Sequence, residues 1–192
     1  KRFRHDVMAH VHHFGDQAPA AKPIIHLGAT SAFVTDNADV LVIREGLRIL
    51  LGRVLAALAS FERFARTHAA LPCLAYTHFQ PAQLTTVGKR ATLWMQDLAL
   101  DVEELVHRLE TLRLRGCKGT TGTQASFLEL FKGDDGRVRE LERRIASKLG
   151  VPRVYPVTGQ TYSRKGDSVV VDALSGIAQS CSKMATDLRL LQ

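Results

Sequence analysis

The feature that most constrains this chain is a long, regular repeat of apolar residues between residues 36 and 64. They recur alternately at every third and fourth position, and they are Val40, Ile43, Leu47, Leu50, Val54, Ala57, Phe61 and Phe64. This spacing is typical of an α-helix that packs along one side against other helices. Asp36 or Asn37 is the expected N-cap, and Leu71-Pro72 is the expected end. A helix of roughly 30 residues would be about 45 Å long, which is unusual in a globular protein.

The same spacing recurs in two further segments. One extends from residue 84 to 112 and is expected to end at Gly116, and the other extends from residue 170 to 191. A shorter amphipathic helix is expected over about residues 135–149, closed by Gly150. No segment alternates convincingly with a period of two, so we expect few strands. The sequence therefore predicts an all-α fold, a bundle of long helices, whose continuous apolar sides favour a homo-oligomer.

Composition excludes several classes of protein. With 192 residues, 45% hydrophobic and 23% charged, the chain can bury a substantial core. Its apolar runs fall short of the roughly 18 residues that cross a bilayer, and no signal-peptide pattern opens it, so we expect a cytoplasmic protein without membrane contact. Three scattered cysteines argue against a disulfide framework and against clustered metal ligands.

The net charge of +7 suits nucleic acid, an acidic membrane face or an anionic small molecule. Aromatic residues make up 6% of the chain and do not alternate with basic residues, which argues against nucleic acid. The chain begins at Lys1 without an initiator methionine and stops at Gln192 inside a helical pattern. We therefore expect a piece of a longer protein.

Polar segments lie where the predicted long helices start and stop. They are Arg4-His5-Asp6, Gly28–Ser31, Thr77-His78, Gly119–Ser126 and Thr158–Lys165. Functional groups are thus expected at the ends of the helices.

His78 is the strongest candidate for chemistry. It lies between Thr77 and the Gln80-Pro81 pair, where Pro81 opposes a continuous helix and the polar side chains have no obvious core to fill. A histidine titrates closest to neutrality, as a general acid or base requires. An isolated histidine is more often structural, but these neighbours favour a site. By contrast His5, between Arg4 and Asp6, fits a solvated charged turn.

The remaining polar segments allow two interpretations each. The loop Gly119–Gln124 resembles an anion-binding loop but lacks a P-loop lysine, and it equally fits a helix-terminating turn. Thr30 and Ser31 are ordinary residues at a helix entry, and Gln160 fits either a helix approach or a ligand contact. The basic residues of the 137–148 segment, with Glu140 and Glu142, predict a solvated and partly paired face. The histidines near the start lack the spacing of a metal motif.

Taken together, five segments resemble the adenylosuccinate lyase family of the fumarase and aspartase superfamily, especially the group that includes the animal enzyme. The segments are Arg4–His10, His26–Ser31 with Asp36-Asn37, Thr77–Gln83, Lys118–Ser126 and Thr158–Tyr162. They cover essentially the whole chain, in order. The resemblance implies that residues 1–192 are the central helical domain of a homotetramer whose sites are shared between subunits.

The resemblance also implies an activity. Members of the family cleave adenylosuccinate to AMP and fumarate, and succinylaminoimidazole carboxamide ribotide to its carboxamide and fumarate, in purine biosynthesis. The substrates are anionic purine nucleotides, and no metal or organic cofactor is implied.

By the same resemblance, His78 is the general acid that protonates the leaving nitrogen. The implied substrate-binding residues are Arg4, His5, Asp6, Thr30, Ser31 and Gln160, and Thr77 and the loop 120–126 line the site. The family's general base is a serine on a Ser-Ser-x-Met-Pro-x-Lys-x-Asn type loop, which is expected beyond Gln192. An N-terminal segment and a C-terminal domain are also expected outside the chain, so this polypeptide alone is expected to be inactive.

Three alternatives stay open at this point. The first is another superfamily lyase, such as argininosuccinate lyase, fumarase or aspartase. The residues of the motifs Thr77–Gln83 and Thr158–Tyr162 argue against it. The second is a catalytically silent helical scaffold, against which four residues argue: His78, Thr30, Ser31 and Gln160. The third is nucleic-acid binding, which predicts a steep dependence of affinity on salt.

Overall fold

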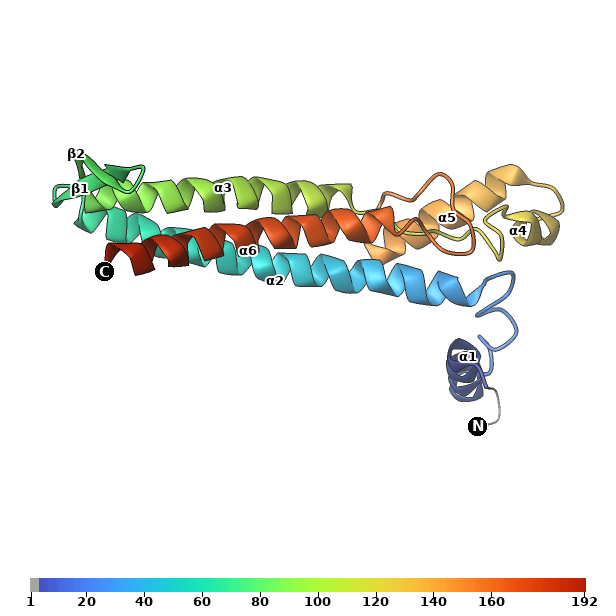
Figure 1. Ribbon diagram of the computed structural model, residues 1–192. Coiled ribbons are helices and arrows are strands. Elements are labelled where there is room, and N and C mark those ends of the chain that lie inside the picture. The colour runs from blue at the N-terminus through green and yellow to red at the C-terminus, as the bar shows by residue number, and fades with distance from the viewer. Residues whose placement is uncertain (1–3) are drawn as a thin grey trace. The chain divides into compact units, whose positions relative to one another are not determined.

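The computed structural model describes residues 4–192, which are mainly helical (Figure 1). In chain order the elements are α1 (Asp6–Gln17), α2 (Ser31–Thr67), β1 (Pro72–Thr77), β2 (Gln80–Thr86), α3 (Val87–Thr111), α4 (Ala125–Leu130), α5 (Asp135–Leu149) and α6 (Lys165–Leu191). The chain forms two compact units: unit 1 runs to Arg44 and includes Thr111–Gly166, and unit 2 comprises Glu45–Glu110 and Asp167–Gln192. The predicted all-α fold is confirmed, apart from one short hairpin.

Helix α5 follows its sequence signals closely. Its N-cap is Asp134, whose carboxylate accepts the backbone N–H of Arg137 at 3.0 Å, and its C-cap is Gly150 in the left-handed region at a φ of +68°. Both signals are local, so the predicted bounds of 135–149 are confirmed. None of the helices in residues 4–192 combines the length and the apolar composition needed to cross a bilayer.

The first long helix differs from its prediction at both ends. Helix α2 begins at Ser31, so Asp36 and Asn37 do not cap it but lie inside it, and both are buried. Asn37 accepts the backbone N–H of Gly116 at 3.1 Å and donates to the carbonyl oxygen of the same residue at 3.3 Å. These polar side chains therefore serve contacts with a distant loop. At the other end the helix stops at Thr67, four residues before Leu71.

The second long helix starts later than predicted, because residues 72–86 form an antiparallel hairpin. Strands β1 and β2 pair from Pro72↔Thr86 to Thr77↔Gln80, with a bulge between Leu74 and Tyr76. Helix α3 begins only at Val87, where the hydroxyl of Thr86 accepts the backbone N–H of Lys89 at 3.1 Å. Leu84, expected in the helix, belongs to β2 and is 79% exposed.

Apolar spacing does not predict the two shortest helices. Helix α1 has His5 as its N-cap, whose ring Nδ1 accepts the backbone N–H of Met8 at 3.3 Å. Helix α4 has six residues, too few to show a periodic pattern, and it follows Gln124, which is in the left-handed region at a φ of +59°.

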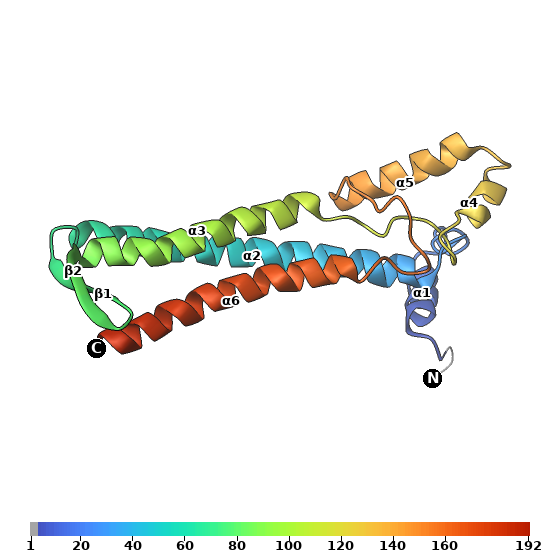
Figure 2. The ribbon, with the colours of Figure 1, turned by 45° about the horizontal axis from the view of Figure 1, so that its top comes forward.

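In unit 2 the core lies among α2, α3 and α6, and Figure 2 shows α2 and α3 alongside each other with α6 running obliquely past them. Ala65, Ala91 and Trp94 are buried there, and Met184 of α6 packs against them. The Trp94 indole N–H donates to the carboxylate of Asp187 at 2.9 Å, and this hydrogen bond is the main cause of the lowered pKa of Asp187. A polar contact thus fixes α6 to α3 beside the apolar core.

In unit 1 the core surrounds an extended segment rather than a helix. Residues 114–119 are all buried, and Leu114 pairs with the 153–155 strand-like segment through backbone hydrogen bonds of 2.9 and 3.0 Å. One apolar cluster contains Val40, Leu114, Ala146, Val151 and Tyr162, and a second contains Cys117, Phe127 and Val138. The segment that follows α3 is therefore part of the core, which fixes the loop that comes after it.

Candidate functional site

Three loops of unit 1 meet at one place, and we name them together the loop cluster: residues 28–31, 114–124 and 158–162. The closest approach is at Gly122, where a Cβ would overlap the carbonyl oxygen of Thr158. The φ of Gly122 is +80°, in the left-handed region that favours glycine. At Gly119 a Cβ would lie 3.8 Å from the carbonyl oxygen of Gly28, which is an ordinary van der Waals distance. Gly122 therefore lets the backbones of the 114–124 and 158–162 loops come together, and the 28–31 loop lies next to Gly119.

Two of the predicted site residues contact each other in the loop cluster. The side-chain amide of Gln160 donates to the hydroxyl of Thr30 at 3.1 Å, across 130 positions of sequence. Thr30 is buried, and Ser31, the first residue of α2, is half-buried beside it in the chain. The hydroxyl and amide groups can donate hydrogen bonds to an anionic ligand.

Asp36 ties the 158–162 loop to α2. Its carboxylate, 2% exposed, accepts the backbone N–H of Tyr162 at 2.9 Å and pairs with the guanidinium of Arg164 at 3.0 Å. That guanidinium lies 4.6 Å from the centre of the Tyr162 ring. A residue that the sequence assigns to helix capping is thus the anchor of a candidate binding loop.

The prediction that the charged residues of α5 are solvated holds for Glu140 and is wrong for Glu142. Glu140 is solvated and pairs with Arg143 and Arg144 at 2.7 Å, as predicted. Glu142, however, turns inward, where its carboxylate binds the ammonium group of Lys118 at 2.7 and 2.9 Å and accepts the backbone N–H of Cys117 at 3.1 Å. The Lys118 side chain is 5% exposed, so this ion pair belongs to the interior.

Cys117 is not a nucleophile in this setting. Burial, and then the Glu142 carboxylate, raises the pKa of its thiol to about 12, so the thiol stays protonated near neutral pH.

The 114–124 loop is closed by hydrogen bonds of Gln124. The carbonyl oxygen of Cys117 accepts the side-chain amide of Gln124 at 3.1 Å, and the backbone N–H of Gln124 donates to the carbonyl oxygen of Lys118 at 2.9 Å. Gln124 closes the loop at its left-handed position.

Charge in the loop cluster is slightly positive. The cluster's own charged residues are two cations, Arg115 and Lys118, and beside it lie the cation Arg164 and the carboxylates of Asp36 and Glu142. Together these groups leave a surplus of one positive charge, which suits an anionic ligand. Among residues 4–192, no group of three or more histidine, cysteine and acidic side chains is placed to hold a metal ion.

The Arg4-His5-Asp6 segment lies at the start of α1 and is exposed. The ring of His5 caps α1 and lies 3.5 Å from the carboxylate of Asp6, so its contacts are local. Within the part of the chain that the structure describes, these side chains make no hydrogen bond to Thr30 or Gln160. The structure does not bring this part of the predicted site to the loop cluster.

His78 and Thr77 belong to unit 2. Thr77 is the last residue of β1 and pairs with Gln80, so His78 and Phe79 are the two residues of the turn. Both have positive φ, +54° and +59°, a conformation that hairpin turns require but that asparagine or glycine usually supplies. His78 is exposed at the tip of the hairpin. Non-glycine residues held in this region are found disproportionately at functional sites.

The base of this hairpin is fixed to the helices of unit 2. The backbone N–H of Val87 donates to the carbonyl oxygen of Leu71, and that of Gly88 to the carbonyl oxygen of His68, both at 2.9 Å. A Cβ on Gly88 would overlap the carbonyl oxygen of Ala65 and lie 2.8 Å from the Cα of Ala69. The placement of the His78 turn therefore depends on backbone contact between α2 and α3.

Gly88→Ala is expected to lower the free energy of unfolding by about 1–3 kcal/mol, because the added methyl group forces the two helix ends apart. Gly52→Ala is the matched control: nothing lies within 4 Å of a Cβ at Gly52, so better helix propensity should raise stability by up to about 1 kcal/mol. Thermal unfolding of both variants at equal protein concentration makes the comparison. Equal melting temperatures would contradict the packing described for Gly88.

Sequence reasoning misses several of the residues that build this site. Asp36 and Asn37 have the composition of a helix cap, and their partners in the other loops are more than 75 positions away. Glu142 occupies one of several charged positions on α5, and no local pattern separates it from Glu140. Arg115, whose contacts are described below, has no sequence signal that we can identify.

Comparisons with known proteins agree with the family resemblance of the sequence. A family model described as lyase matches residues 4–192. The chain is 55% identical over 188 residues to adenylosuccinate lyase of Saccharomyces cerevisiae and 51% identical over 193 residues to adenylosuccinate lyase of Schistosoma mansoni. These alignments cover 98% and 100% of this chain, but only 39% and 40% of the relatives. The chain thus spans about two fifths of the length of the curated relatives it matches.

Solved structures share the fold. The fumarate lyase from Mesorhizobium aligns with a TM-score of 0.75 at 26% identity, covering 86% of this chain and 37% of that one. The β-carboxy-cis,cis-muconate cycloisomerase from Acinetobacter calcoaceticus aligns with a TM-score of 0.79 at 21% identity, covering 96% of this chain and 41% of that one. At 21% identity, the likeness to the cycloisomerase shows only that the two chains share a fold.

Proposed function

Because this chain belongs to the lyase family, we propose that the complete protein eliminates fumarate from adenylosuccinate, giving AMP, and from succinylaminoimidazole carboxamide ribotide, giving the carboxamide, in purine biosynthesis. Identities of 55% and 51% to two adenylosuccinate lyases support this substrate over those of other superfamily lyases. No cofactor is needed for the proposed chemistry, which is a β-elimination by general acid and base.

The observation that carries the proposal is the hydrogen bond between Gln160 and Thr30 in the loop cluster. The two residues come from separate motifs of the resemblance and share a partly buried contact in a region with a surplus of positive charge. The proposed substrates carry carboxylate and phosphate groups throughout the reaction, so hydroxyl, amide and cationic donors that are already in place bind the substrate and the transition state alike. We assign Thr30, Ser31 and Gln160 to substrate binding.

The second half of the proposal is the proton donor. Expulsion of the amino nitrogen requires a proton, and His78 is assigned as the general acid, with Thr77 lining the site beside it. The exposed hairpin tip allows an imidazole to approach a bound substrate. Arg4, His5 and Asp6 are assigned to substrate binding on the resemblance of their motif.

Residues 1–192 are proposed to be the central helical domain of the complete protein. The general base is proposed to be a serine on the Ser-Ser-x-Met-Pro loop, in sequence that follows Gln192. A homotetramer with shared sites, located in the cytoplasm, completes the proposal. Large apolar side chains exposed on the helices, among them Val42 at 70%, Ile49 at 68% and Leu190 at 65%, support packing against other copies.

The test is an assay of the full-length protein, following the loss of adenylosuccinate absorbance and the release of fumarate. We expect turnover with both purine substrates and none with argininosuccinate, malate or aspartate. The 1–192 polypeptide is the matched control and should be inactive. Turnover of one of the other three substrates would replace the assignment, and absence of all turnover would favour a scaffold. An active monomer in sedimentation would contradict shared sites.

A further inference from the structure

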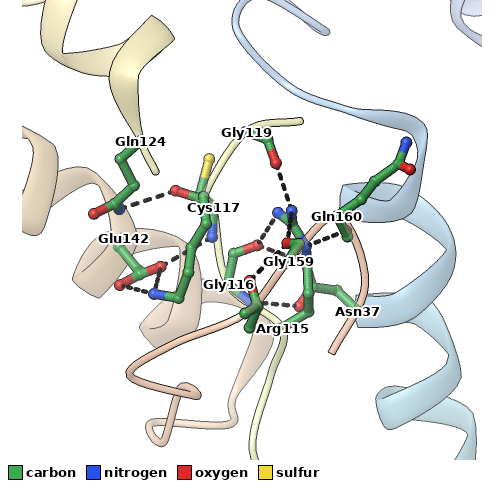
Figure 3. A network of polar contacts seen from close by, with 11 residues as sticks. Asn37, Arg115, Gly116, Cys117, Gly119, Gln124, Glu142, Gly159 and Gln160 are labelled. Carbon is green, nitrogen blue, oxygen red and sulfur yellow. Dashed lines mark hydrogen bonds and ion pairs between the residues drawn. The ribbon is translucent and has the colours of Figure 1, made fainter. Parts of the chain in front are cut away.

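Arg115 is an arginine with no exposed surface in the middle of the loop cluster (Figure 3). Its guanidinium makes four hydrogen bonds to backbone carbonyl oxygens. Nε donates to Gln160 at 2.9 Å, Nη2 to Gly119 at 2.6 Å and to Gly159 at 3.2 Å, and Nη1 to Gly116 at 3.3 Å. The side chain thus bridges the 114–124 loop and the 158–162 loop.

The chemistry of these contacts differs from that of an ordinary buried arginine. Buried guanidinium groups usually bind a carboxylate, because charge is expensive to remove from water. Here every acceptor is a neutral carbonyl group, and burial is the main cause of a lowered pKa for Arg115. Asp36, Cys117 and Glu142 raise that pKa only in part. A lysine cannot replace this arrangement, because it lacks the planar fork that reaches two loops at once.

The bridge acts on a residue that the proposed function uses. The backbone carbonyl of Gln160 is held by Arg115, while its side-chain amide donates to Thr30. Gln160 is therefore fixed at both its backbone and its side chain. Gly119, at the start of the polar loop 119–126, is held by the same guanidinium.

We propose that Arg115 is a positioning residue that holds Gln160 and the loop beginning at Gly119 in the geometry that binds the anionic substrate, without touching the substrate itself. The inference rests on the proposed function, because it names the support of that binding site. A group that binds substrate and transition state equally changes KM rather than kcat when it is displaced. Loss of the bridge is therefore expected to weaken binding more than it slows the chemical step.

The first test is Arg115→Lys in the complete enzyme. We expect KM for adenylosuccinate to rise about tenfold or more while kcat stays within about threefold. Arg44→Lys is the matched control, because the Arg44 guanidinium also donates to two backbone carbonyls, those of Leu149 and Gly150, both at 3.0 Å, but away from the loop cluster. Its KM should stay at the wild-type value. An Arg115→Lys enzyme with wild-type KM, or one in which kcat falls as KM stays constant, overturns the proposal.

The second test does not depend on activity. Amide hydrogen exchange of the wild-type enzyme should show the hydrogen-bonded N–H groups of the two bridged loops, Tyr162 to Asp36 and Gln124 to Lys118, protected like α5. Arg115→Lys should speed exchange at these two amides while α5 keeps its protection. If the wild type cleaves no adenylosuccinate, the proposed function fails but this measurement still tests the bridge. If the variant does not fold, the wild type decides, since rapid exchange of the Tyr162 and Gln124 amides in it overturns the proposal. Equal acceleration over all of unit 1 in the variant also overturns it, because that is a general structural effect.

Discussion

His78→Ala in the complete enzyme is expected to lower kcat by about 10²–10⁴-fold and to leave KM within about threefold, because a general acid acts in the transition state rather than in substrate binding. The measurement is steady-state cleavage of adenylosuccinate at several substrate concentrations. The loss should be smaller for a substrate analogue whose leaving group needs less protonation.

A second variant separates chemistry from conformation. The φ of His78 is +54°, so an alanine there also strains the turn, whereas asparagine tolerates the left-handed region. His78→Asn should therefore keep the hairpin and still lose turnover to the same extent. Recovery of turnover in His78→Asn would show that the alanine variant failed through the turn. Near-normal turnover in both variants would remove His78 from the mechanism.

Gly122→Ala is expected to have the largest effect on stability, lowering the free energy of unfolding by about 2–5 kcal/mol. Two effects add: a residue with a side chain pays about 1–2 kcal/mol in the left-handed region, and the methyl group overlaps the carbonyl oxygen of Thr158, which costs about 1–3 kcal/mol. Because the overlap drives the 158–162 loop away from its partner, binding of the substrate should weaken as well.

Gly133→Ala is the control that isolates the second effect. Gly133 has nearly the same backbone conformation, with a φ of +84°, but nothing lies within 4 Å of a Cβ there. It should lose about 1–2 kcal/mol for the backbone alone and keep its KM. Thermal unfolding at matched protein concentration and a KM determination measure both variants. If the two variants had the same melting temperature, Gly122 could not lie in close contact with the carbonyl oxygen of Thr158.

Local signals predict part of the fold and long-range contacts decide the rest. Helix α5 has an N-cap, a glycine C-cap and an amphipathic pattern within 17 residues, from Asp134 to Gly150, so its bounds follow from sequence. The hairpin is missed because Leu84, Val87 and Ala91 also fit helical spacing. Strands β1 and β2 expose most of their residues, and burial alternates over only four residues of β1 and not in β2. Two short strands carry too little pattern to compete with a neighbouring helix.

The residues of the candidate site are likewise predicted from the sequence only in part. Motif resemblance groups Thr30 with Gln160, and the structure brings these two side chains together. The motif resemblance cannot predict that Asp36 and Arg115 support the loops. In sequence, a capping aspartate cannot be told from a buried one, nor a surface arginine from a buried one. The resemblance also groups Arg4, His5 and Asp6 with this site, and in the structure their contacts stay within α1.

The burial of Cys117 has a practical consequence for spectroscopy. Of the three cysteines, Cys181 on α6 is exposed, Cys73 on β1 is half-buried, and Cys117 is buried with a protonated thiol. Maleimide dyes and spin labels attack thiolates, so labelling of the native chain goes first to Cys181. A Cys73→Ser background then carries a single reporter on unit 2, and the loop cluster keeps its own thiol unmodified without any substitution at Cys117.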